Sequence, residues 1–145
     1  MTSNANRAAT LARALEAGVR NDRAALEDLY VDDVVAWTPA FFAESAKELL
    51  AALDDRDDAF SDITVDIRPL DVGGDHACAE WQVDMTHTGP LVVADGAVVE
   101  PTGLRITLHG ATVAEFRGER ICALRQYWDE LTVFEQRGLL HGGEG

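Results

Sequence analysis

The feature that most constrains the fold of this chain is a long alternation of apolar and polar residues in its last third. Residues 102–140 predict a strand, a tight turn at Arg117 and Gly118, a second strand and a short helix. Because successive side chains on a strand point to opposite faces, every second residue of each strand is expected to face the interior. Each inward face is apolar apart from one uncharged polar residue, Thr112 on the first strand and Gln126 on the second.

The sequence before this hairpin predicts helices first and strands afterwards. Apolar residues at helical spacing indicate a helix over residues 8–19, and Asn21 with Asp22 stops it and caps a second helix. Ser45 and Glu48 form a capping-box pattern for a third helix. Further strands are predicted at residues 34–39, 63–67 and 79–87. This order favours the α+β class, with a strongly curved antiparallel sheet packed against the N-terminal helices.

Size and charge exclude several classes of partner. The 145 residues, 47% of them hydrophobic, suit one domain over residues 1–145. A formal charge of −14, from 26 acidic and 12 basic side chains, would repel phosphate backbones and anionic lipids. We therefore expect neither nucleic acid nor a membrane surface as a partner. The N-terminus has no apolar run of signal-peptide length and no window spans a bilayer, which predicts a cytoplasmic protein.

The cysteine content gives no sign of a metal centre. Cys78 and Cys122 are the two cysteines, and they fit no metal-ligand spacing. We expect buried thiols, with a disulfide only if the two strands are neighbours. No second or third inward ligand accompanies any histidine, so a metal site is not expected.

Several short motifs follow one another along the chain. They are Ala59-Phe60-Ser61-Asp62, Trp81, His87-Thr88-Gly89, Pro101-Thr102-Gly103 and the run YWDELTVFEQRGLL at residues 127–140. Their order and spacing resemble those of the SnoaL-like polyketide cyclases and ester cyclases, a family of the cone-shaped α+β superfamily that includes ketosteroid isomerase. The resemblance covers nearly the whole chain. It implies a cone-like barrel with a deep internal pocket between sheet and helices, a homodimer, and no metal or organic cofactor.

The resemblance also implies chemistry that this chain is poorly equipped to perform. In the cyclases, an aspartate on the last strand and a histidine on the strand before it remove a proton beside a carbonyl, and these places fall on Gln126 and Thr112. Glutamine cannot accept a proton at ordinary pH, and threonine only exchanges hydrogen bonds. The pocket acid and the aspartate of the isomerase branch fall on Thr112 and Thr38. The two carboxylates and arginine of limonene-epoxide-hydrolase chemistry find no inward positions.

His87 and Asp129 are the titratable candidates for catalysis. His87 is predicted to face inward, and imidazole has an ordinary pKa near 6.5 that suits proton transfer. The structural alternative is a strand-end histidine that hydrogen-bonds the connection after Gly89. Asp129 is predicted to point away from the pocket. Either a bulge at the strand end brings its carboxylate to the pocket rim, or the side chain caps the helix that starts near Glu130.

Gln126 is the third catalytic candidate, because its amide can orient a carbonyl. The alternative is a buried amide satisfied by the backbone, since an unpaired one would cost about 1 to 3 kcal/mol. Thr112 has the same two interpretations. Aromatic and apolar side chains complete the predicted ligand-binding wall. Its members are Trp37, Trp81, Met85, Thr112, Leu124 and Trp128. Arg125 and Tyr127 are predicted on the opposite face, at a subunit interface or on a solvated surface.

Three functions remain open on the sequence alone. The first is a domain that binds a small, largely apolar or aromatic carbonyl compound and acts on it as a cofactor-free cyclase or isomerase. In that case His87 would be the base, while Gln126 and Thr112 hold the developing oxyanion. The second is a non-catalytic ligand-binding module that has lost the acid and base of the family. The third is a structural partner that dimerises or docks through the outer face of its sheet.

Overall fold

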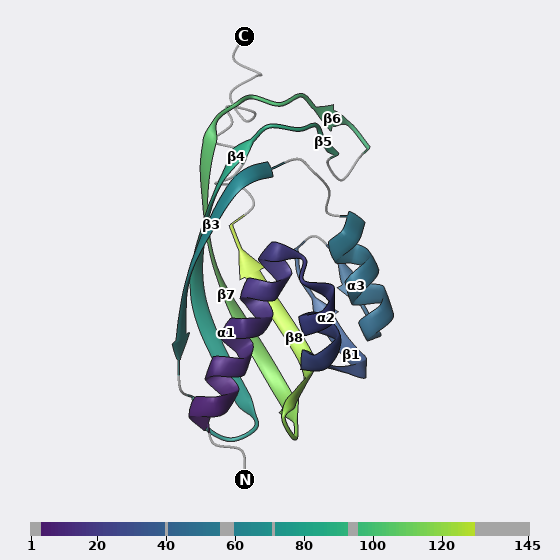
Figure 1. Cartoon of the computed structure of the whole chain (residues 1–145), viewed down its shortest axis with the longest axis vertical. Helices are drawn as coiled ribbons and strands as arrows, with labels where there is room; N and C mark the ends of the chain where they lie inside the picture. The colour runs from purple at the N-terminus through teal and green to yellow at the C-terminus, as the bar shows by residue number, and fades with distance from the viewer. Residues whose placement is uncertain (1–3, 40, 56–59, 71, 93–95, 130–145) are drawn as a thin grey trace.

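The helices of the protein cover one face of a curved sheet. The computed structural model describes residues 4–39, 41–55, 60–70, 72–92 and 96–129. Within these ranges the helices are α1 (Asn4–Arg20), α2 (Arg23–Leu29) and α3 (Ala46–Asp55). Figure 1 shows α1 lying across the sheet, with α2 and α3 beside it. Among the described residues, no helix has the length and apolar character needed to cross a membrane.

The main sheet has six strands in the order β2-β1-β8-β7-β4-β3. They are β1 (Tyr30–Trp37), β2 (Phe42–Ala43), β3 (Phe60–Leu70), β4 (His76–His87), β7 (Arg105–Arg117) and β8 (Arg120–Trp128). A separate pair, β5 (Leu91–Val92) and β6 (Val98–Val99), extends from the end of β4. The predicted α+β class is confirmed. The described sheet is open and mixed, because β1 pairs with β8 in parallel while every other pair is antiparallel.

The helix starts follow the predicted capping chemistry. Asp22 Oδ1 accepts the backbone N–H of Ala25 at 3.3 Å, which satisfies one of the free donors at the start of α2. At the start of α3, the Ser45 hydroxyl accepts a hydrogen bond from the backbone N–H of Glu48 at 3.1 Å. The Glu48 carboxylate in turn accepts one from the backbone N–H of Glu44 at 2.6 Å. Both predicted helix starts are confirmed.

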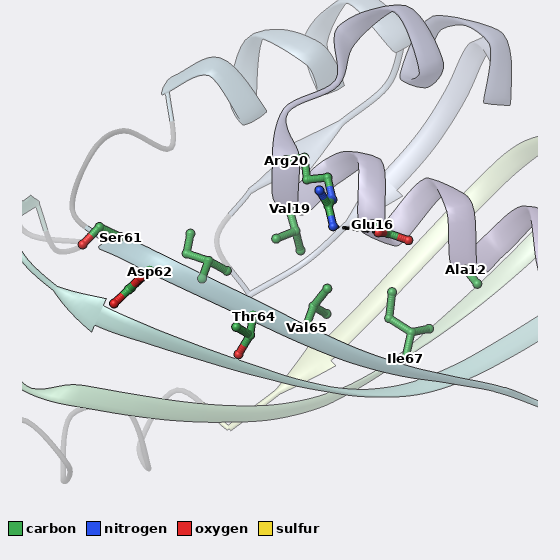
Figure 2. Close-up of a pocket in the computed structure, with 10 residues that line it drawn as sticks. Ala12, Glu16, Val19, Arg20, Ser61, Asp62, Thr64, Val65 and Ile67 are labelled. Carbon is green, nitrogen blue, oxygen red and sulfur yellow. Dashed lines mark ion pairs between the residues drawn. The ribbon is translucent and has the colours of Figure 1, made fainter.

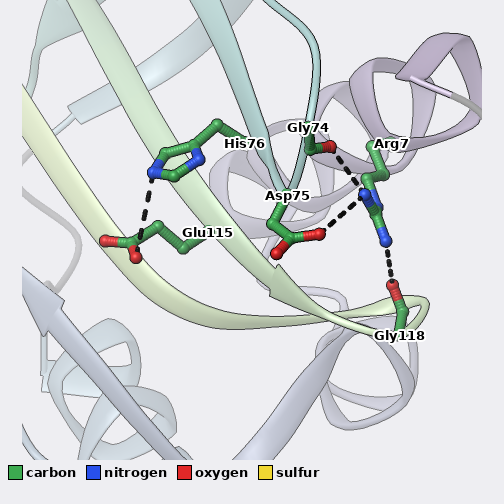
Figure 3. Close-up of polar contacts among 6 residues, drawn as sticks. All are labelled: Arg7, Gly74, Asp75, His76, Glu115 and Gly118. Carbon is green, nitrogen blue, oxygen red and sulfur yellow. Dashed lines mark hydrogen bonds and ion pairs between the residues drawn. The ribbon is translucent and has the colours of Figure 1, made fainter.

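Arg7 holds the first helix against the end of the sheet at which the β3–β4 and β7–β8 turns lie. Its side chain is only 13% exposed, and Nη1 donates to the carbonyl oxygen of Gly74 at 2.6 Å and to Asp75 Oδ1 at 3.3 Å. Nη2 donates to the carbonyl oxygen of Gly118 at 3.3 Å. Figure 3 shows this guanidinium between the β3–β4 and β7–β8 turns. One side chain therefore ties α1 to two hairpins far apart in the sequence.

A β-bulge corrects one predicted face. Strict alternation with Leu124 and Gln126 predicts that Cys122 points inward, but the register shifts so that Glu115 faces Ala123 and Phe116 faces Ile121. The extra residue is Cys122, and Ile121 takes the core position with none of its surface exposed. Both cysteines are free and only partly buried, and β7 lies between their strands. The thiols are therefore not buried as we expected. No disulfide joins them, since their strands, β4 and β8, are not neighbours.

One of the sequence predictions falls outside the described residues. It is the short helix that starts near Glu130, for which Asp129 is a candidate cap.

Candidate functional site

The register of the sheet arranges the inward side chains in rows across the strands. One row joins Ala79 on β4, Thr112 on β7 and Gln126 on β8. The next inward row, two residues nearer the end of β4, joins Trp81, Gly110 and Trp128 in the same way. Ala79 and Thr112 have no exposed surface, and Trp81 keeps only 9%. The predicted inward orientation of Thr112, Gln126 and the two tryptophans is confirmed.

The Trp81 indole is held in place by its neighbours on β7. Its Nε1–H donates to the Thr112 hydroxyl oxygen at 2.9 Å, in a buried hydrogen bond. The ring lies directly over Gly110, because a Cβ added there would come within 2.3 Å of Trp81 Cζ2 and 2.4 Å of Cη2. Trp128 packs edge-on against the ring, with centroids 6.2 Å apart. The absence of a side chain at Gly110 therefore creates the space that the indole fills.

This arrangement gives Thr112 the structural contact of one of its two interpretations, while a contact with a ligand stays a prediction. The hydroxyl oxygen of Thr112 accepts the indole N–H, so its buried polar group is satisfied by the protein itself. Gln126 stands beside it in the same row and is partly buried. None of the hydrogen bonds in the described part of the chain involves the Gln126 amide. Gln126 therefore still has donors and an acceptor to offer a ligand.

His87 is fully buried at the end of β4, where the connection to β7 surrounds it. Its backbone N–H donates to the Leu104 carbonyl at 3.0 Å. The backbone N–H of Thr102 donates to His87 Nδ1 at 3.3 Å, and the Thr102 hydroxyl lies 3.1 Å from the same nitrogen. A nitrogen that accepts a hydrogen bond carries no proton, so the contact with the Thr102 N–H favours the tautomer with its proton on Nε2. These contacts match the predicted strand-end role.

The structure does not bring His87 to the other two members of the predicted catalytic group. Gln126 and Thr112 stand level with Ala79, whereas His87 is eight positions farther along β4. At about 3.3 Å per residue, that separation is about 26 Å along the strand. One small carbonyl group therefore cannot contact the His87 imidazole and the Gln126 amide together.

An open groove of about 650 Å³ runs between α1 and the edge strand β3. Its lining residues are Ala12, Glu16, Val19 and Arg20 from α1, and residues 61–65 with Ile67 from β3. Figure 2 shows α1 passing over β3, with the Glu16–Arg20 ion pair at 3.0 Å on the helix side. In the register of β3 and β4, Ser61 faces Thr86 and Ile67 faces Trp81. The groove therefore runs alongside β4 from the histidine end to the indole.

Comparison with known proteins places this architecture in a family. The sequence profile of the SnoaL-like polyketide cyclases matches residues 9–137. The chain belongs to the SnoaL-like polyketide cyclase family. Among curated protein sequences, none matches this chain significantly.

Solved structures share the fold of this SnoaL-like chain. IdmH, a proposed polyketide cyclase from Streptomyces antibioticus, is 23% identical, with a TM-score of 0.75 over 91% of this chain and 98% of IdmH. A Catenulispora acidiphila protein with a ketosteroid isomerase-like fold is 19% identical, with a TM-score of 0.71 over 90% and 92%. A LEH-like epoxide hydrolase from M. tuberculosis is 18% identical, with a TM-score of 0.68 over 97% and 93%. At these identities the likeness establishes the fold.

The predicted inward orientation of Trp37 is wrong in this SnoaL-like chain. Val34 and Ala36 of β1 are fully buried, so the alternation turns Trp37 to the outer face, where 43% of it is exposed. Its ring lies against Tyr127, with centroids 5.3 Å apart. Trp37 therefore cannot line an interior pocket. Tyr127 is on the outer face as predicted, and the homodimer that the resemblance implies stays a prediction.

The remaining predicted site residues divide between the core and the surface. Leu124 and Met85 are on the inner face, only 4% and 7% exposed. Leu124 packs in the main core and Met85 in a smaller cluster with Ile106. Asp129 follows the end of β8 and is exposed, and its place at the pocket rim or at a helix cap stays a prediction. Whether any of these residues contacts a ligand stays a prediction.

Sequence reasoning missed the polar residues of the groove. Glu16 and Arg20 flank the apolar stripe of α1 one turn apart, and that spacing was the available signal. Ser61 and Asp62 belong to one of the motifs shared with the family. Asp62 has a φ of 55° at a bulge between Ser61 and Thr64, a left-handed conformation that strand patterning does not reveal.

The charged groups of the outer sheet face are engaged with one another. The Asp84 carboxylate accepts one hydrogen bond from the Thr107 hydroxyl at 2.5 Å and another from the Gln82 side-chain amide at 3.1 Å. These hydrogen bonds lower the pKa of the Asp84 carboxyl. Arg125 donates to Glu115 at 2.6 Å and lowers the pKa of that carboxyl. No cluster of three metal-ligating side chains occurs among the described residues.

Proposed function

We propose that this SnoaL-like protein binds a small, largely apolar or aromatic carbonyl compound in the groove between α1 and β3. The observation that supports this proposal is an open groove on the helix-covered face whose mixed lining includes exposed apolar side chains of β3. Ile63 is 40% exposed there, and Val65 and Ile67 remain partly exposed. A ligand that covers these side chains would gain roughly 25 cal/mol for each square ångström of apolar surface removed from water. Polar groups at the rim would orient its carbonyl.

Binding is better supported than catalysis because of what the interior lacks. The two positions at which the cyclases of this family carry their acid and base hold Gln126 and Thr112. The Thr112 oxygen is already engaged by the Trp81 indole. Neither side chain accepts a proton at ordinary pH. A module that retains the fold and binds a ligand needs neither an acid nor a base.

Filling the groove should weaken binding. Ala12 lines it from α1, so Ala12→Phe should weaken the affinity for a flat aryl ketone such as 2-acetylnaphthalene by at least about tenfold. The measurement is isothermal titration calorimetry with the purified protein. Ala9→Phe is the matched control, because Ala9 is exposed on the same helix and lines a different hollow. Equal affinity of the Ala12→Phe and Ala9→Phe variants would contradict binding in this groove.

A second candidate function rests on His87, which lies next to the end of the groove although it does not line it. Phe60, whose ring centroid is 5.5 Å from that of His87, directly precedes Ser61 at the end of the groove. If the ring proton moves from Nε2 to Nδ1, the hydrogen bond from the Thr102 N–H is lost, Nδ1–H donates to the Thr102 hydroxyl instead, and Nε2 becomes a base. The second proposal is therefore a cofactor-free isomerase or cyclase in which His87 removes the α-proton of an enolisable ketone.

Proton exchange in deuterated water tests this second function. We expect deuterium to enter the α-carbon of 2-acetylnaphthalene with the wild-type protein and not with His87→Ala, because no other described inward group can act as the base. His109→Ala is the matched control, since His109 is exposed on the outer face and bonds Gln82. Binding of the ketone by wild type without any exchange would reject catalysis and leave the binding function intact.

A further inference from the structure

We propose that Trp81 is the specificity-determining residue of this site, because its indole separates the α1–β3 groove from the row that contains Thr112 and Gln126. The proposal rests on ligand binding in the groove. It adds a limit on how deeply a ligand can enter.

The position of the indole supports this role. Ile67 is the last β3 residue that lines the groove, and its partner on β4 is Trp81. Behind Trp81, the same row continues to Gly110 and Trp128. A molecule that moves inward from the β3 edge therefore meets the Trp81 ring before it reaches β7 or β8. Thr112, to which the ring is bonded, has no exposed surface at all.

The indole is also prevented from moving aside. The Thr112 hydroxyl holds its Nε1–H at 2.9 Å, and the space over Gly110 accepts its six-membered ring without a Cβ in the way. The edge-on contact with Trp128 closes a third side. A side chain fixed by a buried hydrogen bond and by close packing behaves as a rigid wall.

The two sides of this wall differ in chemistry. On the groove side, β3 contributes three aliphatic side chains, Ile63, Val65 and Ile67, which favour ligands by surface area and shape, and polar residues lie between them. The far side holds the Gln126 amide, which has hydrogen-bonding capacity to spare. Removal of the indole should therefore do two things at once: lengthen the space for an apolar ring system and bring a carbonyl within reach of Gln126.

The test combines ligand size with a double-mutant cycle. The probes are the two-ring ketone 2-acetylnaphthalene and the three-ring ketone 2-acetylanthracene, titrated by calorimetry into wild type, Trp81→Leu, Gln126→Leu and the double variant. Leucine keeps an apolar side chain at each position, and circular dichroism confirms that each variant is folded. Trp37→Leu, on the outer face, controls for the loss of an indole elsewhere.

We expect Trp81→Leu to shift the ratio of affinities toward the three-ring ketone by about tenfold or more, and Trp37→Leu to leave that ratio unchanged. Gln126→Leu should have no effect in the wild type and should weaken three-ring binding in the Trp81→Leu background, which is a coupling that a purely structural role would not produce. Two results would overturn the role of Trp81 as a wall while leaving the binding function intact. One is wild-type binding with an affinity ratio that is unchanged in Trp81→Leu. The other is an effect of Gln126→Leu that is equal in both backgrounds. Failure of all the proteins to bind either ketone would overturn the binding function, and with it the role of Trp81 as a wall.

Discussion

Replacing Trp81 with alanine is expected to lower the free energy of unfolding by about 3 to 5 kcal/mol, the usual cost of removing a large aromatic side chain from a core. Trp81 is only 9% exposed and belongs to the main core cluster. The change also removes the donor that satisfies the Thr112 hydroxyl, in a place with no exposed surface. Because Gly110 has no side chain to fill the space, the cavity should collapse only partly.

Urea unfolding followed by far-ultraviolet circular dichroism measures this loss without depending on tryptophan fluorescence. Trp37→Ala is the matched control, since the same atoms are removed from a side chain that is 43% exposed and touches Tyr127 on the outer face. There we expect a loss of about 1 kcal/mol, mainly from the ring contact. If the two substitutions cost the same within about 0.5 kcal/mol, the buried role of Trp81 is refuted.

Alternation along the long strands made much of the inner face predictable. β7 has thirteen residues, so the period of two repeats often enough to assign Thr112 to the interior from pattern alone. The same holds for Trp81 in the twelve residues of β4. The caps at Asp22 and Ser45 were equally predictable, because they depend on interactions between residues three positions apart.

Short or interrupted strands could not be assigned in this way. β1 carries apolar residues on both faces, so Val35 and Trp37 satisfy one phase of the alternation as well as Val34 and Ala36 satisfy the other. Only the packing of the core against Ala36 decides between them. The bulge at Cys122 has no local signature in sequence. The parallel pairing of β1 with β8 joins segments about 90 residues apart, and no local pattern specifies such a partner.

The candidate site shows the same limit at a larger scale. Period-two alternation reveals which face a residue occupies, but not which row of the sheet it shares with residues of other strands. His87, Thr112 and Gln126 were all correctly assigned to the inner face. Only the register shows that Thr112 and Gln126 are neighbours while His87 lies far along β4. The α1–β3 groove likewise depends on how a helix is placed over a strand.

Gly110→Ala should be the most damaging single-methyl change in the described part of the protein. The added Cβ would lie 2.3 Å from Trp81 Cζ2 and 2.7 Å from the backbone oxygen of Tyr127. The indole cannot retreat without breaking its hydrogen bond to Thr112, and the backbone of β8 cannot move without disturbing the sheet. We expect a loss of about 3 kcal/mol in the free energy of unfolding, at the upper end of the usual range for overpacked cores.

The sign of the effect separates this packing argument from the general preference for alanine over glycine. Gly18 lies inside α1 with nothing within 4 Å of an added Cβ, so Gly18→Ala should raise the stability by about 0.5 to 1 kcal/mol. Urea unfolding of both variants makes the comparison. In a Trp81→Leu background the cost of Gly110→Ala should fall, because the ring that it strikes is gone. An unchanged cost in that background would mean that the Tyr127 backbone, and not the indole, requires glycine at this position.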